Sequence, residues 1–125
     1  MKKRYALTVL LAWLLPGLGH WYIGQRTKAI LFCVLLLATF LTGVVITDGG
    51  CVDWGRHPYA FLLQAADGVV AFATLAVTSS QHEFPASKLG DLGMLYTLVA
   101  GALNVLLIAD ALYRAGPREA KEEKR

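Results

Sequence analysis

Asp67 is the side chain whose chemistry is most conspicuous, because it lies in the middle of a long apolar stretch. Gln64 and Thr74 lie on the same face of a continuous helix as Asp67, at helical spacing. Asn104 occupies a similar depth within another apolar stretch. A carboxyl group with amides and a hydroxyl beside it can bind a proton or a small ion, or can hydrogen-bond two helices together. These four residues form the candidate polar site.

The environment of Asp67 restricts what it can do. A carboxylate at the centre of a bilayer costs about 2.5–3.5 kcal/mol on insertion scales, so Asp67 should face the bundle interior and be protonated or paired. Asn104 is the partner at matching depth, which predicts a hydrogen bond between the two helices. Three roles remain open for Asp67: a polar contact between helices, a proton- or ion-binding group, and a catalytic group.

The remaining reactive side chains do not form a recognisable active site. The histidines and the two cysteines are scattered without zinc-ligand spacing, and no nucleophile, metalloprotease or phosphate-loop motif occurs. Asp110 lies near the end of the last apolar stretch and should either extend toward the membrane interface or pair with Arg114 four residues later. We therefore expect no catalytic residue, no metal site and no cofactor, and we expect that the protein is not an enzyme.

Four apolar stretches must position these residues. The chain is 56% hydrophobic over 125 residues, and a membrane helix needs about 20 apolar residues. The stretches predict an all-α, polytopic membrane bundle of four transmembrane helices arranged as two hairpins within residues 1–113, with spans at 5–23, 29–47, 60–78 and 94–113. Gly116 and Pro117 should end the last helix, and residues 114–125 should form a charged cytoplasmic tail that is disordered or a short surface helix.

The distribution of basic residues predicts the orientation of these helices. With four spans and both termini inside, nine basic residues lie in the cytoplasm and three outside, namely Arg26, Lys28 and Lys88. If the first span is instead re-entrant and three spans cross, the basic residues divide evenly. The four-span arrangement is favoured, although Arg26 and Lys28 do not fit it. A cleaved signal peptide over residues 1–19 is a further interpretation of the same segment.

The first apolar stretch is interrupted by a run of helix-breaking residues. Proline removes a backbone donor, and glycines permit tight turns and close helix contact. Irregular backbone survives within a bilayer only where protein or water covers it, so this break should face the bundle. His20 or Tyr22 should help to satisfy the freed backbone groups. The break is either a kink that lets the hairpin close or a site for a small ligand or a lipid headgroup. The motif residues are Pro16, Gly17, Gly19, His20, Tyr22 and Gly24.

The same run, together with Gln25-Arg26-Thr27-Lys28-Ala29, resembles the hairpin of TM2-domain-like small membrane proteins. The resemblance covers about residues 12–47. His20 and Trp21 stand where the best-known form of the motif carries an Asp-Arg pair. The resemblance implies a helical hairpin and a location in a bacterial inner membrane, and it implies no activity.

Two functions follow from these observations. The first is a structural or interaction role in the lipid bilayer, in which the small-residue faces at Gly43 and at residues 100–102 pack against a second copy or a larger membrane complex. The alternative is an oligomeric component of small-ion or proton transport that uses Asp67. Binding to nucleic acid is not expected, because the basic residues form no stripe with interleaved aromatic residues.

Overall fold

The computed structural model describes residues 2–52, 55, 58–78, 88–122 and 124. The chain is all-α in this part, with two long helices and two interrupted ones. The elements are α1 (Lys2–Leu14), α2 (Leu18–Tyr22), α3 (Arg26–Ile46), α4 (Pro58–Gln64), the 3-10 turn η1 (Ala65–Asp67), α5 (Val69–Thr78) and α6 (Lys88–Glu122).

Two helices, α3 and α6, are long and apolar enough to cross a membrane. They pack against each other along most of the length of α3, and they correspond to the predicted spans 29–47 and 94–113. Small residues permit this contact, because Gly43 on α3 lies against Gly93 and Thr97 on α6. α6 also continues through Gly116 and Pro117, where we expected it to end. A proline within a helix removes one hydrogen bond and bends the helix without having to terminate it.

The other two predicted spans are not continuous helices. The span predicted at 5–23 is divided into α1 and α2 around Pro16 and Gly17, and Gly17 adopts a positive φ of 91°. The span predicted at 60–78 is divided by Gly68, which has a φ of 61°. Residues with side chains avoid this region of backbone conformation, so both interruptions depend on glycine. Within the described residues, two helices are long and apolar enough to cross a membrane, and four continuous transmembrane helices are not shown.

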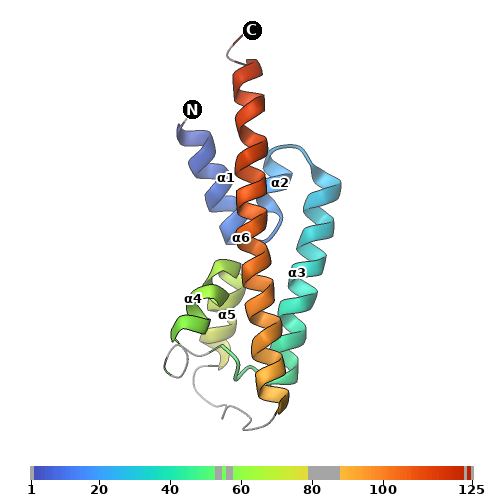
Figure 1. Ribbon diagram of the computed structural model, residues 1–125, viewed down its shortest axis with the longest axis vertical. Helices are drawn as coiled ribbons and strands as arrows, with labels where there is room; N and C mark the ends of the chain where they lie inside the picture. Colours follow the sequence, from blue (N-terminus) through green and yellow to red (C-terminus); the bar gives the residue numbers. More distant parts are fainter. Residues whose placement is uncertain (1, 53–54, 56–57, 79–87, 123, 125) are drawn as a thin grey trace.

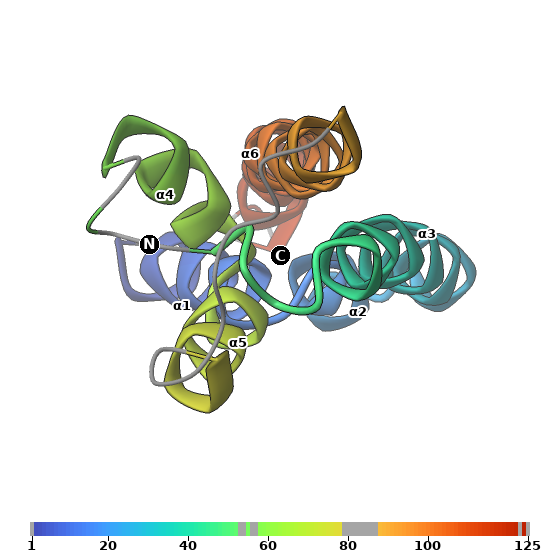
Figure 2. The ribbon, with the colours of Figure 1, turned by 90° about the horizontal axis from the view of Figure 1, so that it is seen from below.

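Each interrupted helix forms a short hairpin that reverses direction. Figure 1 shows α1 running inward from the N-terminus and α2 returning toward the same end. It also shows α4 running inward from the opposite end and α5 returning to that end. Figure 2 shows α4 and α5 well apart, on the two sides of α1. Each half of the chain thus consists of a broken hairpin followed by a long helix. The two halves run in opposite directions along the bundle.

The two ends of the bundle differ in what they contain. The end where α1 begins and α6 finishes also holds the turn between α2 and α3, and we call it the terminal end. The end where α3 finishes and α6 begins is the opposite end. The apolar core lies between the centre and the opposite end and is formed by Phe40, Cys51, Val52, Phe61, Ala71 and Ala100.

Candidate functional site

The two helix breaks meet each other at the centre of the bundle. A Cβ atom added to Gly68 would collide with the backbone carbonyl of Trp13, a residue in the last turn of α1. The Trp13 indole nitrogen donates a hydrogen bond to the carbonyl oxygen of Ala65 at 3.0 Å. The C-terminal ends of α1 and of α4 with η1 therefore approach each other, and carbonyl oxygens from both face the same region.

Asn104 connects these two helix ends to α6. Its side chain is fully buried, and its amide nitrogen donates to the carbonyl oxygen of Ala66 at 2.7 Å and to that of Ala12 at 3.4 Å. Each of these carbonyls belongs to one of the two interrupted helices. We predicted that Asn104 would bond to Asp67. Its amide group donates instead to the backbone carbonyls of Ala66, the residue before Asp67, and of Ala12 near the end of α1.

Gln64 forms a second polar contact with α6, closer to the opposite end. Its amide nitrogen donates to the hydroxyl oxygen of Thr97 at 2.7 Å and to the carbonyl oxygen of Cys51 at 2.9 Å. All three residues are buried. Burial raises the pKa of the Cys51 thiol, so this side chain stays a neutral thiol near pH 7. Thr97 was not among the residues predicted for the site, although its spacing of seven residues from Asn104 places both on one face of α6.

Asp67 lies at the end of η1, immediately before the break at Gly68. It is 1% exposed, and neither of its carboxylate oxygens has a hydrogen-bond partner within the described residues. The side-chain oxygens of Asn104 and Gln64 are also buried and unpartnered in this part of the chain. We call Gln64, Asp67 and Asn104 the polar cluster. The unpartnered side-chain atoms of these three residues are all oxygens, which can accept a hydrogen bond or coordinate a cation.

Thr74 takes a different position from the one its spacing suggested. The shared face with Asp67 requires one continuous helix, but Gly68 separates Thr74 from Asp67 and places it on the returning helix α5. Its hydroxyl donates to the carbonyl oxygen of Val70 in its own helix at 2.8 Å. Gln64 and Asp67 therefore lie on elements that pack against α6, the helix that contains Asn104, whereas Thr74 lies on α5.

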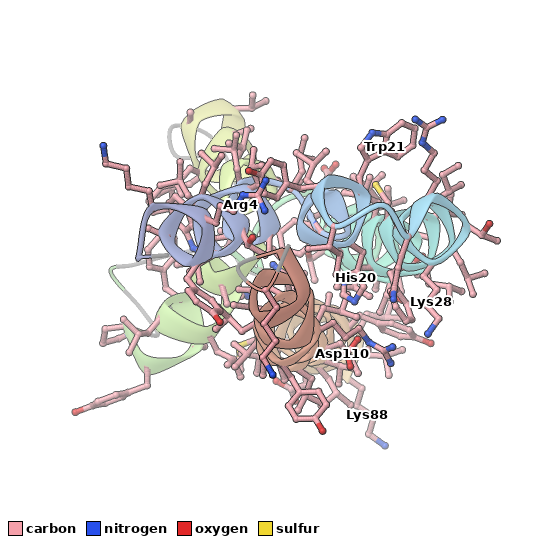
Figure 3. The ribbon with its side chains drawn as sticks, turned by 90° about the horizontal axis from the view of Figure 1, so that it is seen from above. Arg4, His20, Trp21, Lys28, Lys88 and Asp110 are labelled. Carbon is pink, nitrogen blue, oxygen red and sulfur yellow. The ribbon has the colours of Figure 1, made fainter. Side chains whose placement is uncertain are left out.

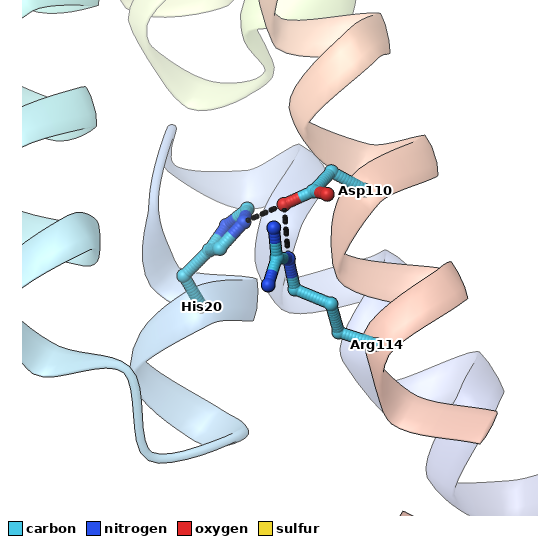
Figure 4. A network of polar contacts seen from close by, with 3 residues as sticks. All are labelled: His20, Asp110 and Arg114. Atoms are coloured by element: carbon cyan, nitrogen blue, oxygen red, sulfur yellow. Dashed lines mark hydrogen bonds and ion pairs between the residues drawn. The ribbon is translucent and has the colours of Figure 1, made fainter. Parts of the chain in front are cut away.

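A second polar network lies toward the terminal end (Figure 4). A nitrogen of the buried His20 ring, Nε2, lies 2.9 Å from Oδ2 of Asp110, and Nε of Arg114 donates to the same oxygen at 2.7 Å. The predicted pair between Asp110 and Arg114 is confirmed. His20 was expected to serve the nearby backbone break, but it reaches across to α6 instead. No local spacing indicates this contact, because the two residues are 90 positions apart.

The glycines of the hairpin motif act through close contacts and turns. Gly17 lies against the carbonyl group of Ala29 at the start of α3, and Gly19 lies against Ala12 and Ala111. Gly24, with a φ of 85°, forms the turn into α3. Pro16 is buried at the break and Tyr22 is exposed, so Tyr22 does not cover the interruption. Among the described residues, no three His, Cys, Asp or Glu side chains gather to hold a metal ion.

The amino-acid sequence was compared with known protein families, and one family matches most of the chain. The model of a family of unknown function, DUF6677, matches residues 7–125. The chain belongs to the DUF6677 family. This assignment differs from the TM2-domain-like family, whose hairpin the motif at Pro16–Gly24 resembles. No curated protein and no solved structure matches the chain. The DUF6677 match begins within α1 and continues through both long helices to residue 125.

Proposed function

We propose that this DUF6677 protein is an integral membrane protein in which α3 and α6 cross the bilayer and the two hairpins are re-entrant. The outward surfaces of the crossing helices support this proposal. Val45 on α3 is 77% exposed and Leu106 on α6 is 65% exposed, and many other large apolar side chains are exposed beside them. A continuous apolar surface of this kind is a liability in water and suits lipid.

The distribution of charge supports the re-entrant arrangement over four crossings. The terminal end would hold ten of the twelve basic residues, and the opposite end would hold only Arg56 and Lys88. This division is more uneven than the nine to three of the four-span arrangement, and it accounts for Arg26 and Lys28. The positive-inside rule then orients the terminal end, with both termini, toward the cytoplasm of a bacterial inner membrane. The ten residues are Lys2, Lys3, Arg4, Arg26, Lys28, Arg114, Arg118, Lys121, Lys124 and Arg125.

The function that this geometry supports best is the binding and exchange of a proton or a small monovalent cation at Asp67. The observation that carries the proposal is the carboxyl group itself, which is buried where the two broken helices meet and has no hydrogen-bond partner among the residues that the structure describes. Interrupted helices from two oppositely oriented repeats commonly form the ion site of membrane transporters, near the middle of the bilayer. The role is binding and transport rather than catalysis.

The electrostatics of the site favour a positive charge. The C-terminal end of a helix carries about half a negative charge from its free carbonyl groups. α1 ends beside the Asp67–Gly68 turn, and η1 ends at Asp67 itself. Two carbonyl ends and a carboxyl group in a region of low dielectric constant attract a cation, whether it is a proton on Asp67 or a metal ion among the oxygens. A single chain encloses this site, so passage across the membrane would require a homo-oligomer or a moving hairpin.

The structural or interaction role is the second candidate. It relied on small-residue faces at Gly43 and at residues 100–102 being available to other helices. Gly43 instead contacts α6, and Gly101 contacts the backbone of Leu63 within the same chain. Ala102 is exposed, so part of that face remains available to a partner. The polar site therefore has stronger support than the packing faces.

Ion flux in reconstituted liposomes tests the proposal. Wild-type protein should carry protons, measured with an enclosed pH-sensitive dye, or sodium, measured with a sodium-sensitive dye. Asp67→Asn should reduce that flux to the level of protein-free liposomes. Asp91→Asn is the matched control, because Asp91 is exposed near the start of α6 and lies outside the cluster.

The same preparations separate the two candidate functions. Thermal unfolding and the oligomeric state in detergent establish that both variants are folded. Equal flux in wild type and Asp67→Asn, or no flux of either ion in wild type, contradicts the transport proposal. An absence of flux combined with a changed oligomeric state in Asp67→Asn would support the interaction role instead.

A further inference from the structure

An apolar pocket opens between the first helix break and the start of α3. Its volume is about 260 Å³, and its walls are formed by the 15–18 break together with Trp21 on one side and by Ala29, Ile30 and Cys33 on the other. Gly17 lies against the Ala29 backbone at its base. Ile30 and Trp21 are about half exposed, so the pocket opens on the outer surface of the bundle rather than into the core.

The rim of this pocket carries a positive charge. The Arg26 guanidinium lies over the Trp21 ring, 5.7 Å from the ring centroid, at the edge nearest the terminal end. The first turn of α3 contains no acidic residue to compensate Arg26. Figure 3 looks onto this end and shows Trp21 and Lys28 pointing away from each other. Lys28 is therefore the neighbouring charge that does not lie over the pocket.

We propose that this pocket holds an acyl chain of an anionic glycerophospholipid, and that Arg26 binds the phosphate of the same lipid. The proposal rests on the membrane location proposed above and is independent of any role for Asp67. An apolar pocket on a surface facing lipid is filled by hydrocarbon, and the cationic rim selects the headgroup. In the re-entrant arrangement, the rim lies at the cytoplasmic headgroups, where anionic lipids accumulate.

The placement of Trp21 agrees with this occupant. Indole rings prefer the boundary between headgroups and acyl chains, and here the ring separates the apolar walls from the guanidinium group. An arginine held against an aromatic ring is already oriented, so it loses little conformational freedom when it binds a phosphate. A planar guanidinium can also donate two parallel hydrogen bonds to phosphate oxygens.

Native mass spectrometry of the full chain in detergent tests this proposal. Phosphatidylglycerol and phosphatidylcholine with the same acyl chains are titrated separately, and the fraction of lipid-bound protein is measured. We expect wild type to bind phosphatidylglycerol at least about tenfold more tightly, which corresponds to one charge-assisted contact. Arg26→Gln should remove this preference, whereas the control Lys28→Gln should retain it.

A second variant tests the pocket rather than the charge. Cys33→Phe places a ring in the pocket and should weaken the binding of both lipids while leaving the Arg26 rim intact. Thermal unfolding of each variant without added lipid confirms that it is folded. Equal binding of the two lipids by wild type, unchanged preference in Arg26→Gln, or unchanged binding in Cys33→Phe would overturn the proposal. So would a second copy of the chain occupying the pocket, detected as a dimer that Cys33→Phe dissociates.

Discussion

Trp13 and Ala65 are joined by a hydrogen bond from the indole nitrogen to the carbonyl oxygen, across 52 positions of sequence. The donor is in the last turn of α1 and the acceptor is in the first residue of η1. The Ala65 carbonyl also accepts the backbone N–H of Gly68, so the indole adds a second bond to it, while Asn104 donates to the carbonyls of Ala12 and Ala66 at the centre of the bundle. The two hairpins therefore contact each other at their breaks, and Asp67 lies in the turn where this contact is made.

Cysteine accessibility distinguishes the re-entrant arrangement from four crossings. In a background with Cys33 and Cys51 replaced by alanine, single cysteines are introduced as Thr27→Cys and Gly55→Cys. The re-entrant arrangement places position 27 in the cytoplasm and position 55 outside, and four crossings reverse both. A membrane-impermeant maleimide added to intact cells should therefore label position 55 and spare position 27.

Lys88→Cys provides the control for this experiment, because position 88 is outside in both arrangements. It should be labelled in intact cells, and all three positions should be labelled after the membrane is opened. Labelling of position 27 in intact cells, with position 55 protected, would refute the two-crossing arrangement and restore the four-span one.

Replacement of Gly68 by alanine should destabilise the fold. Alanine is strained at a φ of 61°, and its Cβ would collide with the Trp13 carbonyl. We expect a loss of about 1–3 kcal/mol in the free energy of unfolding. The measurement is reversible unfolding in detergent, followed by circular dichroism.

Gly116→Ala is the matched substitution within a helix. The nearest group to its added Cβ is the hydroxyl of the Tyr5 side chain, at 3.3 Å, which is the end of a flexible side chain and can shift. Because Pro117 follows, a Cβ at this position is mildly disfavoured in a helix, and we expect a loss of stability smaller than that of Gly68→Ala. If Gly68→Ala behaves in the same way, the close contact between the two hairpins is not a requirement of the fold.

The bond between His20 and Asp110 should contribute measurably to stability, because it ties the first hairpin to α6. A double-mutant cycle with His20→Ala and Asp110→Ala should give a coupling free energy of about 1–2 kcal/mol. His20 is 1% exposed, which limits competition from water, although Asp110 is 37% exposed.

The neighbouring pair gives an internal comparison for that cycle. Arg114 and Asp110 are both more than one-third exposed and lie on one helix, so their coupling should be about 0.3–0.5 kcal/mol. If the two pairs have equal coupling free energies, the bond of the buried His20 stabilises the fold no more than an exposed ion pair does.

Local sequence patterns predicted the parts of the fold that depend on local chemistry. The apolar runs indicated α3 and α6, and Pro16 with Gly17 indicated the first break. The break at Gly68 was missed, since a single glycine in an apolar run is also compatible with a continuous helix. That omission placed Thr74 on the same face as Asp67 and predicted one continuous helix over 60–78, where the structure has α4, η1 and α5.

Contacts between distant segments could not be predicted in the same way. Asn104 was predicted to bond to Asp67, but it donates to the carbonyls of Ala66 and Ala12, and these partners depend on where the two hairpins end. The contact of His20 with Asp110 joins residues from opposite ends of the chain. Helical spacing describes neighbours on one helix, and it contains no information about which helix lies opposite.

The bonds of Asn104 have a consequence for the biogenesis of the protein. The carbonyl group of Ala12 receives its donor from a residue that the ribosome adds 92 positions later. In the proposed membrane arrangement, the first hairpin would enter the bilayer before this donor exists, so the Ala12 carbonyl would need another partner during insertion. The earliest part of the chain would then reach its final structure only after α6 is made.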